Sequence, residues 1–168
     1  ELMRKLVLKN ESKEEFDALV ARDYGLFLFA ETISDNQDLL FWNNQKILPP
    51  TADFSLPDGE YFQQLANGYY VIIKTKLTFA NMSNHVIAYV LIPVKNQYYL
   101  ETDYLVQRFI HDKDAINQIS ISESQTKYPL KSQNGKTVFF IKGVTHPKVA
   151  TTDSLTILLR LATLIFLL

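Results

Sequence analysis

The stretch that decides the fold is the pair of segments 69–77 (YYVIIKTKL) and 85–93 (HVIAYVLIP). Both segments are rich in β-branched and aromatic residues, which favour strands. They are joined by a seven-residue link, whereas a crossover between parallel strands needs roughly a dozen residues or more. We therefore predict a long antiparallel hairpin at the centre of a sheet, with Ile72, Ile87 and Val90 in the core.

The sequence before this hairpin predicts helices followed by a second hairpin. Residues 2–8 place apolar side chains on one face of a helix, and residues 12–23 follow with the S-x-x-E capping box of Ser12 and Glu15. Residues 26–30 (LFLFA) and 39–42 (LLFW) are apolar runs separated by turn-forming residues, which is typical of two paired strands.

The rest of the chain predicts further short elements. We expect a short helix that begins at Asp58 and ends at the Asn67-Gly68 pair, and a helix over residues 99–110. Residues 118–122 predict a strand, and the Asn134-Gly135 pair predicts a tight hairpin turn before a strand at 137–141. The helices and strands do not alternate as in a parallel α/β fold. The predicted fold class is α+β, with a single antiparallel sheet of about five or six strands and helices packed on one face.

Composition excludes several classes of protein. The 168 residues include no cysteine, so disulfides, zinc–thiolate sites and cysteine nucleophiles are excluded. The formal net charge is −1, which gives no basic excess for binding the phosphates of nucleic acid. Hydrophobic residues make up 47% of the chain, far above the content of disordered chains.

The C-terminal residues suggest a membrane-proximal end. Residues 161–168 are apolar except for Thr163, and the chain starts with Glu1 rather than methionine. We expect residues 1–152 to form one domain and residues 153–168 to begin a truncated transmembrane helix. The alternative is an amphipathic helix docked on the sheet, but a docked helix should carry a polar stripe.

No motif for catalysis or cofactor binding is found. The three histidines, His85, His111 and His146, do not form a metal-ligand spacing, and no phosphate-binding glycine loop or nucleophile elbow occurs. We therefore predict no catalytic residue, no metal and no cofactor.

A few polar and aromatic residues are candidates for a ligand pocket. They are Trp42, Asn67, Tyr69, Tyr89 and Arg108. Trp42 follows an apolar strand and precedes two amides, so it is either a packing residue, which we favour, or part of a pocket wall. Arg108, expected on a helix near aromatic residues, could pair with an anionic ligand or simply be solvated.

Several short segments follow one another along the chain in a characteristic order. They are 39–44 (LLFWNN), 67–70 (NGYY), 90–93 (VLIP) with Tyr98, Tyr104, Leu105 and Phe109, and Asn134-Gly135 before Val138-Phe139. In this order they resemble the extracytoplasmic sensor regions of membrane histidine kinases from Bacteroidetes-type bacteria. The resemblance spans about residues 26–142 and departs from the family pattern at Asn43 and Asn44, where that pattern has Ser-Asp.

The resemblance implies a function and a location. It implies a PAS-like or Cache-like sensor domain in the periplasm, held in the inner membrane by flanking helices, with kinase machinery beyond Leu168. Such a domain is not itself an enzyme; it receives a small-molecule or protein stimulus, acts as a homodimer in the parent protein and does not bind nucleic acid. The alternative is a dimerisation or protein-interaction module without a small ligand. An enzyme is a third hypothesis, which the missing site motifs disfavour.

Overall fold

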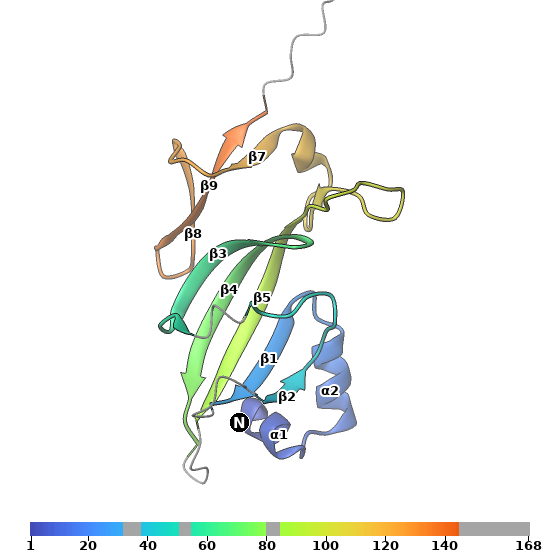
Figure 1. The fold of residues 1–168 in the computed structure, drawn as a ribbon, viewed down its shortest axis with the longest axis vertical. Coiled ribbons are helices and arrows are strands. Elements are labelled where there is room, and N and C mark those ends of the chain that lie inside the picture. Colours follow the sequence, from blue (N-terminus) through green and yellow to red (C-terminus); the bar gives the residue numbers. More distant parts are fainter. Residues whose placement is uncertain (32–37, 51–54, 80–84, 145–168) are drawn as a thin grey trace, which may run out of the picture.

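A computed structural model describes residues 1–31, 38–50, 55–79 and 85–144 of the chain. Its main feature is a six-stranded antiparallel sheet (Figure 1). In spatial order, its strands are β2 (Leu39–Trp42), β1 (Gly25–Ala30), β5 (Val86–Asn96), β4 (Gly68–Leu77) and β3 (Gly59–Leu65), with the short β6 (Arg108–Phe109) paired to the end of β5.

The predicted central hairpin is confirmed. Strands β4 and β5 pair antiparallel with Ile73 opposite Val90, and both lie inside the sheet rather than at its edges. Ile72 and Ile87 are buried, and Val90 is half-buried against the core. The strand-forming composition of the two segments and the short link between them therefore predicted this hairpin correctly.

Two short helices cover one face of the sheet next to its β2 edge. They are α1 (Leu2–Leu8) and α2 (Lys13–Val20), which bury Leu6 and Leu19 against Leu28 and Val86 of the sheet. The predicted capping box is present: the Ser12 hydroxyl accepts from the Glu15 amide, and the Glu15 carboxylate accepts from the Ser12 amide. The second helix ends at Val20, three residues before the predicted end.

The buried side chain of Asn43 connects the end of helix α2 to strands β1 and β2. Its Oδ1 accepts from the Leu26 amide at 2.7 Å, and its Nδ2 donates to the carbonyls of Leu19 at 2.8 Å and Tyr24 at 3.1 Å. One amide therefore links β2, the start of β1 and the end of α2. A buried polar group needs such partners to offset its lost hydration.

The opposite face of the sheet carries a second apolar cluster. Phe27, Tyr70, Ile72, Tyr89 and Leu91 are buried there, and Ile47 from the β2–β3 connection packs against them. This face is the floor of the cleft described below.

Two predicted helices are wrong. Residues 59–65 form strand β3, because every position from Gly59 to Leu65 pairs with β4 through the turn at Asn67-Gly68. Pairing with the adjacent strand β4 outweighs the helical spacing of Tyr61, Phe62 and Leu65. Residues 99–107 form an exposed loop rather than a helix, and the sheet offers no face on which their apolar side chains are buried.

The prediction of a single sheet is also wrong. A separate three-stranded antiparallel sheet follows the short helix η2 (Asp114–Asn117), in the order β7 (Ile119–Ser122), β9 (Thr137–Gly143) and β8 (Tyr128–Lys131). It lies beyond the β3 end of the large sheet (Figure 1). The predicted turn at Asn134-Gly135 is confirmed: the Gly135 amide donates to the Ser132 carbonyl at 2.9 Å, and Gly135 has a φ of 77°.

The predicted terminal helix of residues 153–168 lies outside the described residues. Among the residues that the structure does describe, no helix has the length and hydrophobicity needed to cross a membrane.

Candidate functional site

A cleft of about 730 Å³ opens between two parts of the chain that are distant in sequence. One side is formed by the start of β1 and the β2–β3 connection, and the other by the end of β5 and the segment from Tyr98 to His111. Its size lies within the range of small-molecule sites, roughly 300–1,000 Å³.

The floor of the cleft is apolar and comes from the second core cluster. Phe27, Leu91 and Pro93 line it, together with Tyr70. The Tyr70 hydroxyl donates to Asn67 Oδ1 at 2.9 Å. Burial raises the pKa of Tyr70, and this hydrogen bond only partly opposes that shift. The hydroxyl is therefore a neutral donor at physiological pH, and the Asn67 amide is held in place by it.

Each wall of the cleft carries one carboxylate and one cation. Asp23 and Lys46 lie on the β1 side, and Asp103 and Arg108 on the opposite side. Throughout the described ranges, the ion pairs join other residues: Arg4 with Glu1, Lys5 with Glu15, and Lys76 with Glu31. Asp23, Lys46, Asp103 and Arg108 thus line the cleft without forming ion pairs with one another within the described residues.

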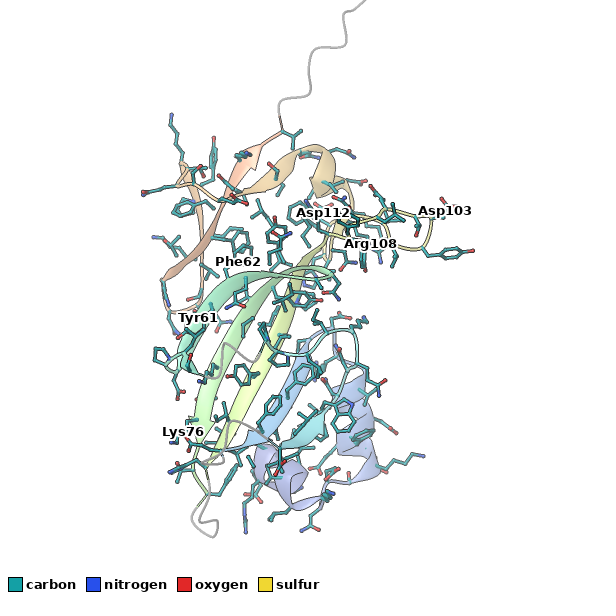
Figure 2. All side chains as sticks on the ribbon, viewed as in Figure 1. Tyr61, Phe62, Lys76, Asp103, Arg108 and Asp112 are labelled. Atoms are coloured by element: carbon teal, nitrogen blue, oxygen red, sulfur yellow. The ribbon has the colours of Figure 1, made fainter. Side chains whose placement is uncertain are left out.

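The loop of residues 97–107 projects beside the cleft and is ordered by its own hydrogen bonds. Backbone bonds join Thr102 and Leu105 in both directions, and the Glu101 carboxylate accepts from the Gln107 amide at 3.1 Å. Figure 2 shows Asp103 at the outer end of this loop and Arg108 where the chain returns to the sheet. The loop exposes large side chains, with Tyr99 and Tyr104 almost fully accessible and Leu100 68% exposed.

Of the five predicted pocket residues, the structure brings two to the cleft. Asn67 and Arg108 line it, but Arg108 lies on strand β6 rather than on the predicted helix. Tyr89 does not line the cleft: its ring is completely buried and packs edge-on against Phe29, with the ring centroids 5.9 Å apart.

Trp42 and Tyr69 also lie away from the cleft. Trp42 sits on the edge strand β2 and is 44% exposed, so its predicted role as a core packing residue is not supported. Tyr69 stacks on Phe62 at 5.7 Å, and Lys95 Nζ lies 6.0 Å from the centre of its ring. Because neighbouring residues of a strand point to opposite faces, Tyr70 reaches the cleft floor and Tyr69 does not.

Sequence reasoning missed Asp23, Lys46 and Asp103. They come from three connecting segments, and no spacing rule relates positions so far apart in the chain. The only local signal was the exposed polar character of these segments, which is ordinary for loops.

Neither a metal-ligand cluster among the described residues nor a similar protein indicates what the site binds. Across the part of the chain that the structure describes, no three His, Cys, Asp or Glu residues are grouped as metal ligands. Comparison of the chain with protein-family models, curated proteins and solved structures finds no match.

Proposed function

We propose that this chain is the non-catalytic, signal-sensing input domain of a membrane sensor histidine kinase, exposed in the periplasm and anchored in the inner membrane by flanking helices. The proposal keeps the PAS-like or Cache-like character and the homodimeric parent protein that the sequence resemblance implies. The observation that carries it is a continuous physical connection from the cleft to the last described strand.

This connection runs across the large sheet into the small one. Tyr70 forms part of the cleft floor on β4 and pairs with Gln63 on β3. The neighbouring residue Phe62 stacks on Phe139 of β9, with ring centroids 4.3 Å apart. Strand β9 ends at Gly143, and residues 153–168, where we expect the membrane helix, begin after nine further residues of the chain.

Polar contacts strengthen the same junction. Lys136 Nζ donates to the Glu60 carbonyl at 3.0 Å and lies 5.8 Å from the ring centre of Tyr61. Asn134 Nδ2 donates to the Glu60 carboxylate at 3.4 Å. The β8–β9 turn therefore rests on β3, so a shift of β3 on ligand binding would move β9.

A ligand can shift the output only if it binds one arrangement of this junction more tightly than the other. The construction of the cleft supports such a difference, because its two walls come from separate segments whose spacing a ligand would change. The residues beyond Gly143 would pass the change to the kinase.

The test is phosphorylation of the parent protein in membrane vesicles. We expect ATP-dependent histidine phosphorylation whose level changes when Phe139 is replaced by Ala, while Phe16→Ala on α2, whose ring packs against Phe41 and not at this junction, leaves the level unchanged. A parent protein without ATP-dependent histidine phosphorylation would overturn the proposal.

One observation favours a second function, a protein-interaction module that needs no small ligand. The 97–107 loop exposes Tyr99, Leu100 and Tyr104, although its backbone is well ordered by hydrogen bonds. Ordered, exposed aromatic side chains are typical of the anchors in protein interfaces. If Tyr99→Ser and Leu100→Ser abolish signalling while the cleft variant Arg108→Gln does not, this second function is favoured.

A further inference from the structure

We infer that the cleft binds a short peptide with free termini and an apolar side chain. The inference rests on the proposed function, since it names the stimulus that the sensing cleft would receive. It follows from three properties of the cleft: opposite charges on both walls, free amide groups between them and an apolar floor.

The charges define a ligand that carries both signs. Arg108 and Asp23 both line the cleft, on segments far apart in the chain, and within the described residues neither side chain forms an ion pair or a hydrogen bond. A guanidinium binds a carboxylate through two parallel hydrogen bonds, which a lysine ammonium cannot do. We therefore place the peptide carboxylate at Arg108 and its ammonium group at Asp23.

The neutral polar groups of the cleft suit peptide bonds. Asn44 uses its Oδ1 to accept from the Lys46 amide at 3.0 Å, which leaves its Nδ2 without a partner in the described part of the chain. The Asn96 amide and the Tyr98 hydroxyl also line the cleft, and no described residue hydrogen bonds to either side chain. These groups can donate to and accept from the backbone of a bound peptide.

The floor suits an apolar side chain. Phe27 and Leu91 are almost completely buried beneath the cleft, and Val106 and Ile110 add apolar surface on the side of the loop. A side chain such as phenylalanine would bury its surface there, while the termini remain near the charged walls.

Calorimetric titration of the 168-residue chain in mild detergent tests the inference. The probes are the tripeptide Ala-Phe-Ala with free termini, its N-acetylated form, its C-amidated form and 3-phenylpropionate. We expect the free tripeptide to bind, each blocked form to bind about tenfold more weakly because one charge-assisted contact is lost, and 3-phenylpropionate to bind more weakly still.

Two variants with matched controls assign the two termini. Arg108→Gln should weaken the free tripeptide about tenfold and remove the difference between the free and the amidated forms. Asp23→Asn should likewise remove the difference between the free and the acetylated forms. The controls Arg22→Gln and Asp17→Asn change the same residue types at exposed positions outside the cleft, and they should leave binding unchanged.

The outcomes separate this inference from the proposed function. If no peptide binds, or if blocked and free forms bind equally, the peptide inference is wrong, whatever the kinase assay shows. If the free peptide binds as expected but the parent protein has no histidine phosphorylation, the site stands and the sensor-kinase proposal fails.

Discussion

The ring of Phe62 stacks on the ring of Phe139 at a centroid distance of 4.3 Å and an interplanar angle of 17°. This pair joins the edge strand β3 of the large sheet to the central strand β9 of the small sheet. Its centroid distance is shorter than those of the Phe16–Phe41, Phe29–Tyr89 and Phe62–Tyr69 pairs. The stability of the small sheet should therefore depend on it.

Phe139→Ala should release the small sheet without unfolding the large one. Both rings are half-buried, so we expect a loss of about 1–2 kcal/mol from burial and ring stacking. Hydrogen exchange should show faster exchange of the β8 and β9 amides and unchanged protection in β4 and β5. Equal loss of protection in both sheets would show that they unfold as one unit.

Asn43→Ala should be among the most destabilising polar substitutions at the helical corner. It removes three hydrogen bonds and leaves the buried Leu26 amide without its acceptor, which we expect to cost about 2–4 kcal/mol. Chemical denaturation measures the loss. The control is Gln45→Ala, an exposed neighbour that should change stability by less than about 0.5 kcal/mol.

Gly68→Ala should impair folding, whereas Gly135→Ala should be tolerated. Gly68 has a φ of 151°, and a Cβ atom there would lie 2.1 Å from the Lys95 carbonyl oxygen. Gly135 also has a positive φ, but no atom lies within 4 Å of its Cβ position. We expect a cost of about 1–2 kcal/mol at Gly135 from backbone strain alone and a clearly larger one at Gly68. Equal melting temperatures for the two variants would contradict this close approach of the turn to β5.

The ion pair of Glu15 with Lys5 should make stability fall in acid. The hydrogen bond from Lys5 at 2.6 Å, followed by that from the Ser12 amide, lowers the pKa of Glu15 below its usual value of 4.5. A lowered folded-state pKa means that this contribution is present above the unfolded pKa and is lost as the pH falls through the folded one.

The measurement is the free energy of unfolding along a descending pH series. The wild-type chain should lose stability below pH 4.5 more steeply than Glu15→Gln, and salt should reduce the difference because the pair is accessible to solvent. Parallel curves for the two proteins would show that this pair does not contribute.

The elements that could be predicted from the sequence are those whose signal is local. The β4–β5 hairpin, the capping box of α2 and the turn at Gly135 each depend on residue types within a short stretch. Strand β3 was missed because Tyr61, Phe62 and Leu65 fit a helical spacing equally well. Only its pairing with β4 across the Asn67-Gly68 turn decides between the two, and the spacing within residues 59–65 does not reveal that pairing.

The cleft could be predicted only in part for a related reason. Asn67 and Arg108 were identified because an Asn-Gly pair and an arginine among aromatic residues are recognisable locally. Asp23 and Lys46 line the same cleft as Arg108 only when β1 pairs with β5. Trp42 was misjudged because a rare aromatic residue suggests a core or a pocket, whereas the edge position of β2 leaves it partly exposed.

The most direct test of a signal that passes from β3 to β9 is to cross-link the junction between the two sheets with a disulfide in the parent protein. The described chain has no cysteine of its own, so Phe62→Cys with Phe139→Cys adds a single pair to this domain. We predict that oxidation fixes the level of histidine phosphorylation, that reduction restores the wild-type response, and that neither single variant shows this behaviour. Equal phosphorylation in the oxidised and reduced double variant, with the disulfide confirmed by mass spectrometry, would contradict a signal that passes from β3 to β9.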